Sequence, residues 1–143
     1  MKIHPLPIPS PLRAFAAPIY LSRVPAGFPS PADDYVDKPL DLNELLIRHP
    51  SATFYCQVSG ESMTGAGIFD GDILIVDCAL RASHGDVVLA TLDGEMTCKI
   101  LDLHHQRLLA ANRDYAPIPI REGCDFVIKG VVTSSIRRHR CLP

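Results

Sequence analysis

The sequence has no strong excess of charge, no long apolar run and no tryptophan. Its formal net charge is −2, whereas a nucleic-acid-binding domain usually carries a strong basic excess, so no strong direct binding of nucleic acid is expected. No window approaches the ~18 to 20 consecutive apolar residues that a membrane span requires. Prolines interrupt the apolar residues near the N-terminus, so no signal peptide is expected. These absences predict a soluble, cytosolic protein without a membrane partner.

The sequence also lacks a Cys-x-x-Cys pair. Five cysteines are present, an odd number that does not favour a disulfide framework or a zinc site: Cys56, Cys78, Cys98, Cys124 and Cys141. In apolar runs a reduced cysteine behaves as a small hydrophobe. His104 and His105 are adjacent and would point apart on a strand, so a shared metal site is not expected and two surface residues near a turn is the simpler interpretation. We expect neither a metal nor a cofactor.

Basic residues cluster only near the C-terminus, where Arg137, Arg138 and Arg140 surround His139. A solvated tail is the simpler interpretation of such a cluster. A contact with a phosphate or with a partner protein is the alternative.

Prolines divide the chain into two segments of different character. Eight of the thirteen prolines lie in residues 1–31, at positions 5, 7, 9, 11, 18, 25, 29 and 31. Proline lacks the amide donor and restricts its predecessor to extended geometry. We therefore predict that residues 1–38 form an extended arm with little regular structure of its own. Its apolar residues, such as Ile19 and Phe28, suggest that it docks in a groove.

Residues 39–143 are predicted to form a compact, mainly β domain. A short helix comes first, with Asp41 as N-cap, Glu44 completing a capping box and Pro50 ending the element. Runs rich in Val, Ile, Leu and Thr then follow, separated by turn residues, over 52–58, 72–77, 86–92, 95–101, 107–111 and 125–133. Asp93-Gly94 between two such runs is a strong hairpin signal. Strands this short and closely spaced indicate a largely antiparallel sheet.

The glycine-rich stretch GESMTGAGIFDGD (60–72) places Ser62 between an acid and a methionine. It lacks the last glycine of G-x-S-x-G, the lysine of a phosphate-binding loop and the terminal glutamate of a calcium loop. By composition alone it is a turn between strands. A catalytic Ser62 would need a base at neutral pH.

Several residues could supply that base. His49, His84, His104 and His105 are all candidates. Lys99 is another, provided that an apolar setting lowers its pKa. Alternation along its strand places Lys99 with Glu95 and Thr97 on a mostly polar face, so an ordinary solvent-facing lysine stays open as well.

Four stretches in the same order resemble the UmuD/LexA family of self-cleaving serine peptidases, in particular UmuD and plasmid-borne relatives such as MucA and RumA. They are GESMTGAGIFDGDILIVD (60–77), SHGDVVLATLDGEMTCKIL (83–101), AANRDYAPIPI (110–120) and GVVTSS (130–135). The resemblance runs from about residue 20 to residue 135.

The resemblance implies a serine–lysine dyad, with Ser62 as nucleophile and Lys99 as general base. Gly60 and Met63 would belong to the loop that presents Ser62 and its oxyanion donors. The family cuts itself at a small residue–Gly bond in the N-terminal arm, and Ala26-Gly27 matches that bond. The proline directly before Ala26 would stiffen how the bond is presented.

The resemblance further implies an SOS mutagenesis protein. Such a protein forms a homodimer, is stimulated to cleave itself by the RecA filament on single-stranded DNA, and joins a UmuC-like Y-family polymerase subunit for error-prone lesion bypass.

Three other functions fit the sequence less well. A LexA-like repressor would need a helix-turn-helix domain before the cleavage site, where only 26 proline-rich residues stand. A signal peptidase would need a membrane segment. A non-cleaving polymerase interaction module is disfavoured because both residues of the dyad are present.

Overall fold

A computed structural model of the chain describes residues 1–6, 16–17 and 39–140. The chain divides into two compact units, one made of Met1–Ile8 with His49–Pro143 and the other of Pro9–Arg48. Most of the predicted arm lies outside the described residues, so its boundary at residue 38 stays a prediction. None of the helices described is both long and apolar enough to cross a membrane.

The first unit is built on one eight-stranded antiparallel sheet, which confirms the mainly β prediction. Its strands lie in the order β1 (Lys2–Pro5), β4 (Thr53–Ser59), β5 (Ile73–Asp77), β10 (Phe126–Ile136), β6 (Val87–Leu92), β7 (Glu95–Asp102), β8 (Arg107–Leu109) and β9 (Ile118–Pro119). Two 3-10 turns, Pro50–Ala52 and Thr64–Ala66, flank β4. All six predicted β runs are strands in the structure.

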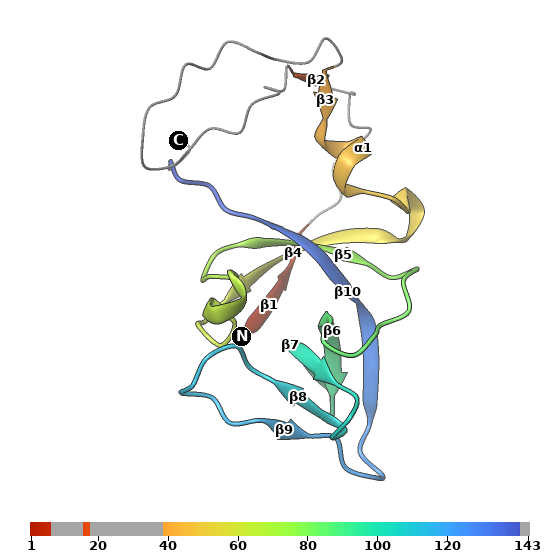
Figure 1. Ribbon diagram of the computed structural model, residues 1–143, viewed down its shortest axis with the longest axis vertical. Coiled ribbons are helices and arrows are strands. Elements are labelled where there is room, and N and C mark those ends of the chain that lie inside the picture. The colour runs from red at the N-terminus through yellow and green to blue at the C-terminus, as the bar shows by residue number, and fades with distance from the viewer. Residues whose placement is uncertain (7–15, 18–38, 141–143) are drawn as a thin grey trace. The chain divides into compact units, whose positions relative to one another are not determined.

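The long strand β10 joins the two halves of this sheet, since it pairs with β5 on one side and with β6 on the other. In Figure 1 it is the long blue strand that runs beside both. Its register shifts between Ile128 and Gly130 and again between Val132 and Ser134, and such bulges bend a sheet. The sheet curls far enough that β1 contacts β7, although four strands (β4, β5, β10 and β6) lie between them in the strand order.

The predicted hairpin at Asp93-Gly94 is confirmed. Both residues have positive φ, 49° and 86°, as the two central residues of a tight hairpin turn of the I′ type require. The turn sets the register of β6 against β7, in which Leu92 faces Glu95 and Val88 faces Lys99. A local turn signal therefore determines where Lys99 lies along the sheet.

The N-terminal residues add a strand that the sequence did not predict. Lys2–Pro5 form strand β1 and pair with β4 at the edge of the sheet, with Ile3 opposite Val58. Proline has no backbone N–H to donate, so it is tolerated at the end of an edge strand, as Pro5 is in β1. The number of prolines in the arm therefore does not show that Lys2, Ile3 and His4 can still pair with β4.

The second unit contains two short strands and a helix, β2 (Ala16–Ala17), β3 (Leu40–Asp41) and α1 (Leu42–Leu46). Strands β2 and β3 pair antiparallel. The predicted N-cap is confirmed, since the Asp41 carboxylate accepts a hydrogen bond from the backbone N–H of Asn43 at 2.9 Å. The helix ends at Leu46, before Pro50, which instead begins the 3-10 turn ahead of β4.

Two apolar clusters fill the interior of the first unit. One lies between β4, β5, β6, β7 and the loop after β4, and includes Met63, Leu74 and Leu89; the other lies around Val88, Leu101 and Leu108. Cys56 and Cys98 belong to the first cluster as free thiols. Burial raises their pKa values to about 11 and about 12, so both behave as core residues, as the sequence predicts.

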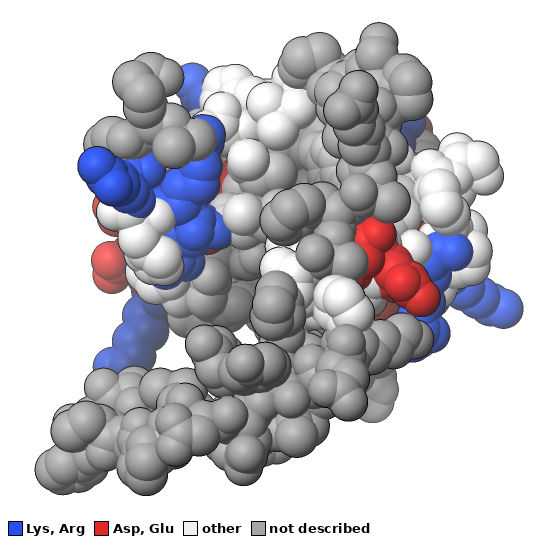
Figure 2. Space-filling model, turned by 90° about the horizontal axis from the view of Figure 1, so that it is seen from above, with Lys and Arg blue, Asp and Glu red and all other residues white. Residues whose placement is uncertain are grey.

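Among the described residues visible in Figure 2, charged side chains of both signs are present. This mixture matches the near-neutral net charge of −2.

Candidate active site

Ser62 and Lys99 meet in the interior, although 37 positions separate them in the chain. The Lys99 Nζ donates to Ser62 Oγ at 3.1 Å. Ser62 is 0% exposed and Lys99 4% exposed. Ser62 comes from the loop after β4, and Lys99 from the middle of β7. Of the candidate bases in the sequence, Lys99 is therefore the one placed within hydrogen-bond distance of the serine.

The loop that carries Ser62 owes its path to Gly60. This residue has a φ of 102°, a conformation that residues with a side chain rarely adopt. Its N–H donates to the Asp70 carboxylate at 2.8 Å, which ties the two ends of the loop together. Met63, directly after the serine, is fully buried, and its carbonyl accepts from the N–H groups of Ala66 and Ile68. The predicted loop residues thus shape and anchor the backbone around Ser62.

A second segment, residues 110–112, clamps this loop from the other half of the sheet. The Ala111 N–H donates to the Ser62 carbonyl at 2.8 Å, and the Gly65 N–H donates to the Ala111 carbonyl at 2.7 Å. Asn112 donates its side-chain amide to the Glu61 carbonyl at 2.8 Å. Residue-by-residue reasoning missed this clamp, and the only signal for it was the family resemblance of AANRDYAPIPI.

Arg137 anchors the far end of the same loop. Its guanidinium donates twice to the buried Asp72 carboxylate, at 3.0 Å each, and once to the Gly67 carbonyl at 2.9 Å, and it lies 3.9 Å above the Phe69 ring. Burial acts to raise the pKa of Asp72, but the hydrogen bonds from Arg137 and the Phe69 N–H hold it below its usual range. The interpretation of a solvated tail is therefore wrong for Arg137, which is bound into the folded domain.

Two further acceptors surround the Lys99 amine. Its Nζ donates to the Thr97 hydroxyl at 3.0 Å and to the Cys98 carbonyl at 3.3 Å. Burial lowers the pKa of Lys99. The solvent-facing interpretation of Lys99 is therefore wrong. Alternation placed it on a polar face, but the curl of the sheet and the Ser62 loop cover that face at Lys99 while Glu95 stays exposed.

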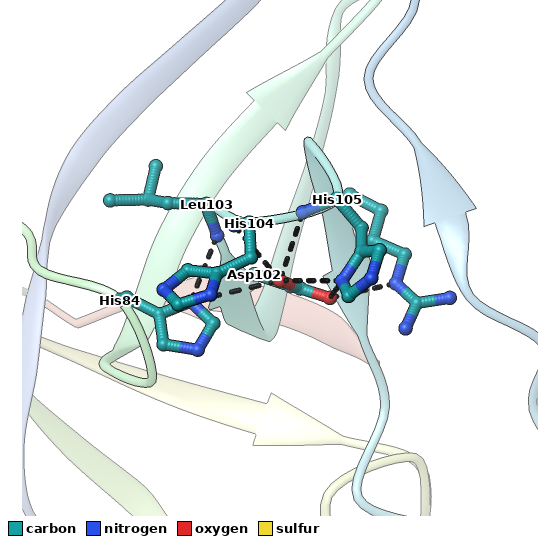
Figure 3. Close-up of polar contacts among 6 residues, drawn as sticks. His84, Asp102, Leu103, His104 and His105 are labelled. Atoms are coloured by element: carbon teal, nitrogen blue, oxygen red, sulfur yellow. Dashed lines mark hydrogen bonds and ion pairs between the residues drawn. The ribbon is translucent and has the colours of Figure 1, made fainter.

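Three of the histidines proposed as bases belong to a different cluster, around Asp102 (Figure 3). His105 Nδ1 lies 3.0 Å from the buried Asp102 carboxylate, and His84 Nδ1 lies 3.7 Å from it on the opposite side. His104 stacks on His84 with ring centroids 3.8 Å apart. The adjacent His104 and His105 thus turn to different partners, as the sequence predicts.

Arg107 completes this cluster, and its Nε–H donates to Asp102 at 2.8 Å, which holds the pKa of that carboxyl well below its usual range. The fourth histidine candidate, His49, contacts Asp77 at 2.7 Å. Within residues 1–6, 16–17 and 39–140, no group of three or more His, Cys, Asp or Glu side chains is arranged to hold a metal ion.

A cavity of about 690 Å³ opens beside Lys99. Its lining comes from Met1 and β1, from the hairpin of β6 and β7, and from β9 and the loop before it: Met1, Lys2, Ile3, His4, Leu92, Glu95, Met96, Thr97, Lys99, Tyr115, Ala116 and Ile118. A space of this size accommodates several residues of an extended peptide. The predicted cleavage bond, Ala26-Gly27, lies outside the described residues.

Comparison with known proteins places these features in a family. The family model described as Peptidase S24-like matches residues 18–133. Protein MucA of Salmonella typhimurium is 45% identical over 129 residues, which cover 89% of this chain and 88% of that protein. Protein SamA of Salmonella typhimurium is 44% identical over 125 residues, 87% of each chain. The LexA repressor of Xylella fastidiosa is 38% identical over 122 residues, 84% of this chain but only 57% of that protein.

Proposed function

Because the chain belongs to the peptidase S24-like family, as a UmuD-like member similar to MucA and SamA, we propose that it is a serine peptidase that cuts its own Ala26-Gly27 bond. Ser62 is the nucleophile and Lys99 the general base. One observation carries the proposal, namely the 3.1 Å contact between two buried side chains, Lys99 Nζ and Ser62 Oγ. A serine requires such a neighbouring base for activation.

The partners of Lys99 specify how its amine acts. A neutral amine has two N–H bonds and one lone pair. The Cys98 carbonyl can only accept a hydrogen bond, and the Thr97 hydroxyl accepts the second. The lone pair is then directed at Ser62, whose O–H donates to it. In the ammonium form all three N–H groups donate and Ser62 Oγ is an acceptor, so the serine is not activated.

The reaction follows from this arrangement. Lys99 takes the Ser62 proton as Oγ attacks the Ala26 carbonyl carbon, and backbone amides of the loop, that of Met63 among them, stabilise the oxyanion. Lys99 then passes the proton to the Gly27 nitrogen as the C–N bond breaks. The ester between Ser62 and Ala26 remains. A water molecule, deprotonated by Lys99, hydrolyses it and restores Ser62.

The arm can reach this site as an extended strand. Peptides commonly add to sheet edges or lie in grooves in that form, and the cavity beside Lys99 offers such a groove. Thirty-four residues separate Gly27 from Ser62, and a span of about 110 Å is possible when they are extended. Cleavage within one chain and cleavage of a second chain are therefore both geometrically allowed.

The biological role that we propose comes from the relatives. The chain would act in the cytoplasm as a homodimer in the SOS response. The RecA filament on single-stranded DNA would stimulate cleavage, and the product would serve as accessory subunit of a UmuC-like Y-family polymerase. The near-complete coverage of MucA and SamA supports this role over that of LexA, of which the chain spans about half.

Incubation of the purified chain at alkaline pH, with and without RecA, single-stranded DNA and a nucleotide, tests the proposal. Mass spectrometry should find a cut after Ala26 that is lost in Ser62→Ala and Lys99→Ala. An uncut chain under every condition would favour the non-cleaving interaction module. A cut at another bond would overturn the site assignment.

A further inference from the structure

Strand β1 lies beside the proposed dyad, although it is far from Lys99 in the sequence. Met1 and Ile3 pack on the apolar cluster that contains Met63 and Cys98, the direct neighbours of Ser62 and Lys99 in the chain. Strand β1 is held on β4 along its length, from Lys2 opposite Ser59 to Pro5 opposite Cys56. It also contacts β7, the strand that carries Lys99.

The fit of β1 at this place is close. The Met1 Cα lies only 3.3 Å from the position that a Cβ on Gly60 would occupy, so the glycine of the Ser62 loop leaves room for the first residues of the chain. Met1, Ile3 and their neighbours form one wall of the cavity that opens on Lys99. Without β1 this wall would be solvent, and the cover over Lys99 would be incomplete.

We propose that β1 keeps water away from Lys99 and thereby favours the neutral, proton-accepting form of its amine. Removing water from around an ammonium group disfavours the charged form. Burial of Lys99 is also the main cause of its lowered pKa, which agrees with the geometry. Ile3 is then a positioning residue that acts through hydration of the base. The inference concerns the same site as the proposed function and rests on it for its catalytic meaning.

Other groups around Lys99 also affect its charge and must stay constant in a test. Those that face it or line its cavity are the Met1 amino group, Lys2 and His4 on β1, Glu95 and the Cys98 thiol on β7, Ser62 on the loop after β4, and Tyr115 before β9. The thiol is neutral, because burial raises its pKa to about 12. Replacing Ile3 by another uncharged residue leaves all of these groups in place, so a change in the titration of Lys99 then reports its hydration.

The experiment compares Ile3→Asn, whose amide draws water to the wall, with Ile3→Val, which keeps it apolar. Self-cleavage of the full chain is followed from pH 6 to 11. Below the pKa of the base, each unit by which that pKa rises lowers the neutral fraction tenfold. We expect Ile3→Asn to cleave roughly tenfold more slowly near pH 7, for a rise of about one unit in the pKa of the base, and to approach the wild-type rate once the pH exceeds that pKa. Ile3→Val should follow wild type throughout.

A second readout does not depend on cleavage. In the full chain with Ser62→Ala, NMR of ¹³C-labelled lysine follows the titration of Lys99 directly, and its midpoint should lie at higher pH with Ile3→Asn than with Ile3→Val. A rate loss of the same factor at every pH, or an unchanged midpoint, would overturn the inference. An uncut wild-type chain whose midpoint still moves would refute the proposed function and leave the role of β1 intact. If Ile3→Asn fails to fold, as judged by circular dichroism, Ile3→Thr replaces it.

Discussion

Replacing Thr97 by valine is expected to lower the maximal rate of self-cleavage, because it removes one of the two acceptors that orient the Lys99 lone pair. The Thr97 hydroxyl lies 3.0 Å from Lys99 Nζ, and the Cys98 carbonyl lies 3.3 Å from it. Valine has the shape of threonine without the hydroxyl, so the strand and its packing stay close to native. With one acceptor left, the neutral amine can rotate its lone pair away from Ser62.

The size of the effect follows from the hydrogen bond that is lost. A neutral hydrogen bond contributes about 0.5–1.5 kcal/mol net, and one to a charged group about 1.5–3 kcal/mol. If the neutral contribution is lost from the transition state, the maximal rate falls about two- to tenfold. The ammonium form loses more than the neutral form, so the pKa of Lys99 falls further. The rate should then reach its plateau at a lower pH than in wild type.

The assay is the rate constant for cleavage after Ala26, measured by mass spectrometry over a range of pH. Thr97→Ser is the matched control, because it keeps the hydroxyl and should retain most of the plateau rate. An unchanged plateau in Thr97→Val, or a profile that moves to higher pH, would show that Thr97 does not orient the Lys99 amine.

Three further predictions follow from the contacts around the dyad. A Cβ on residue 65 would lie 2.5 Å from the Ala111 carbonyl oxygen, so Gly65→Ala should lose about 1–3 kcal/mol in chemical denaturation and also slow cleavage; retained stability and rate would refute the clamp. Lys99→Met should raise the thermal midpoint near neutral pH, because it removes a buried ammonium group. The difference between the two proteins should shrink as the pH rises towards 10.5, since the unfolded wild-type chain then holds more protons than the folded one and the wild type gains stability. A difference that stays the same at every pH would contradict this. Arg137→Met should lower the thermal midpoint, because it leaves the buried Asp72 carboxylate without its cation. This loss of stability should shrink as the pH falls below 3.8, where Asp72 is protonated in the unfolded chain. A loss of stability that does not change with pH would show that packing on Phe69 is the main contribution of Arg137.

Local signals predicted most of the strands, because turn chemistry is read from neighbouring residues. Asp93-Gly94 adopts the positive φ values that its composition favours, and the hairpin that it forms places Lys99 opposite Val88. The Asp41 cap was equally local and was confirmed. Strand β1 was missed because its partner, β4, lies about fifty positions away, and nothing in Lys2–Pro5 itself signals that pairing.

The family resemblance predicted that Ser62 and Lys99 act together, and the fold places them in contact. Pattern reasoning could not choose Lys99 over His49 or the histidines near Asp102, since all carry a suitable nitrogen. The choice depends on which side chains the curled sheet brings within 3.1 Å of the serine.

Residues close together in the chain were sufficient to predict six β runs, the turns between them and the glycine-rich turn that contains Ser62. The burial of the base depends instead on the tertiary structure. Burial of Lys99 needs β7, the Ser62 loop and the N-terminal strand β1 at one place, and alternation along β7 alone predicted a polar, exposed face. The tertiary structure likewise brings Arg137 into contact with Asp72, 65 positions earlier in the chain. Both outcomes depend on water being excluded by segments distant in sequence, which no local pattern records.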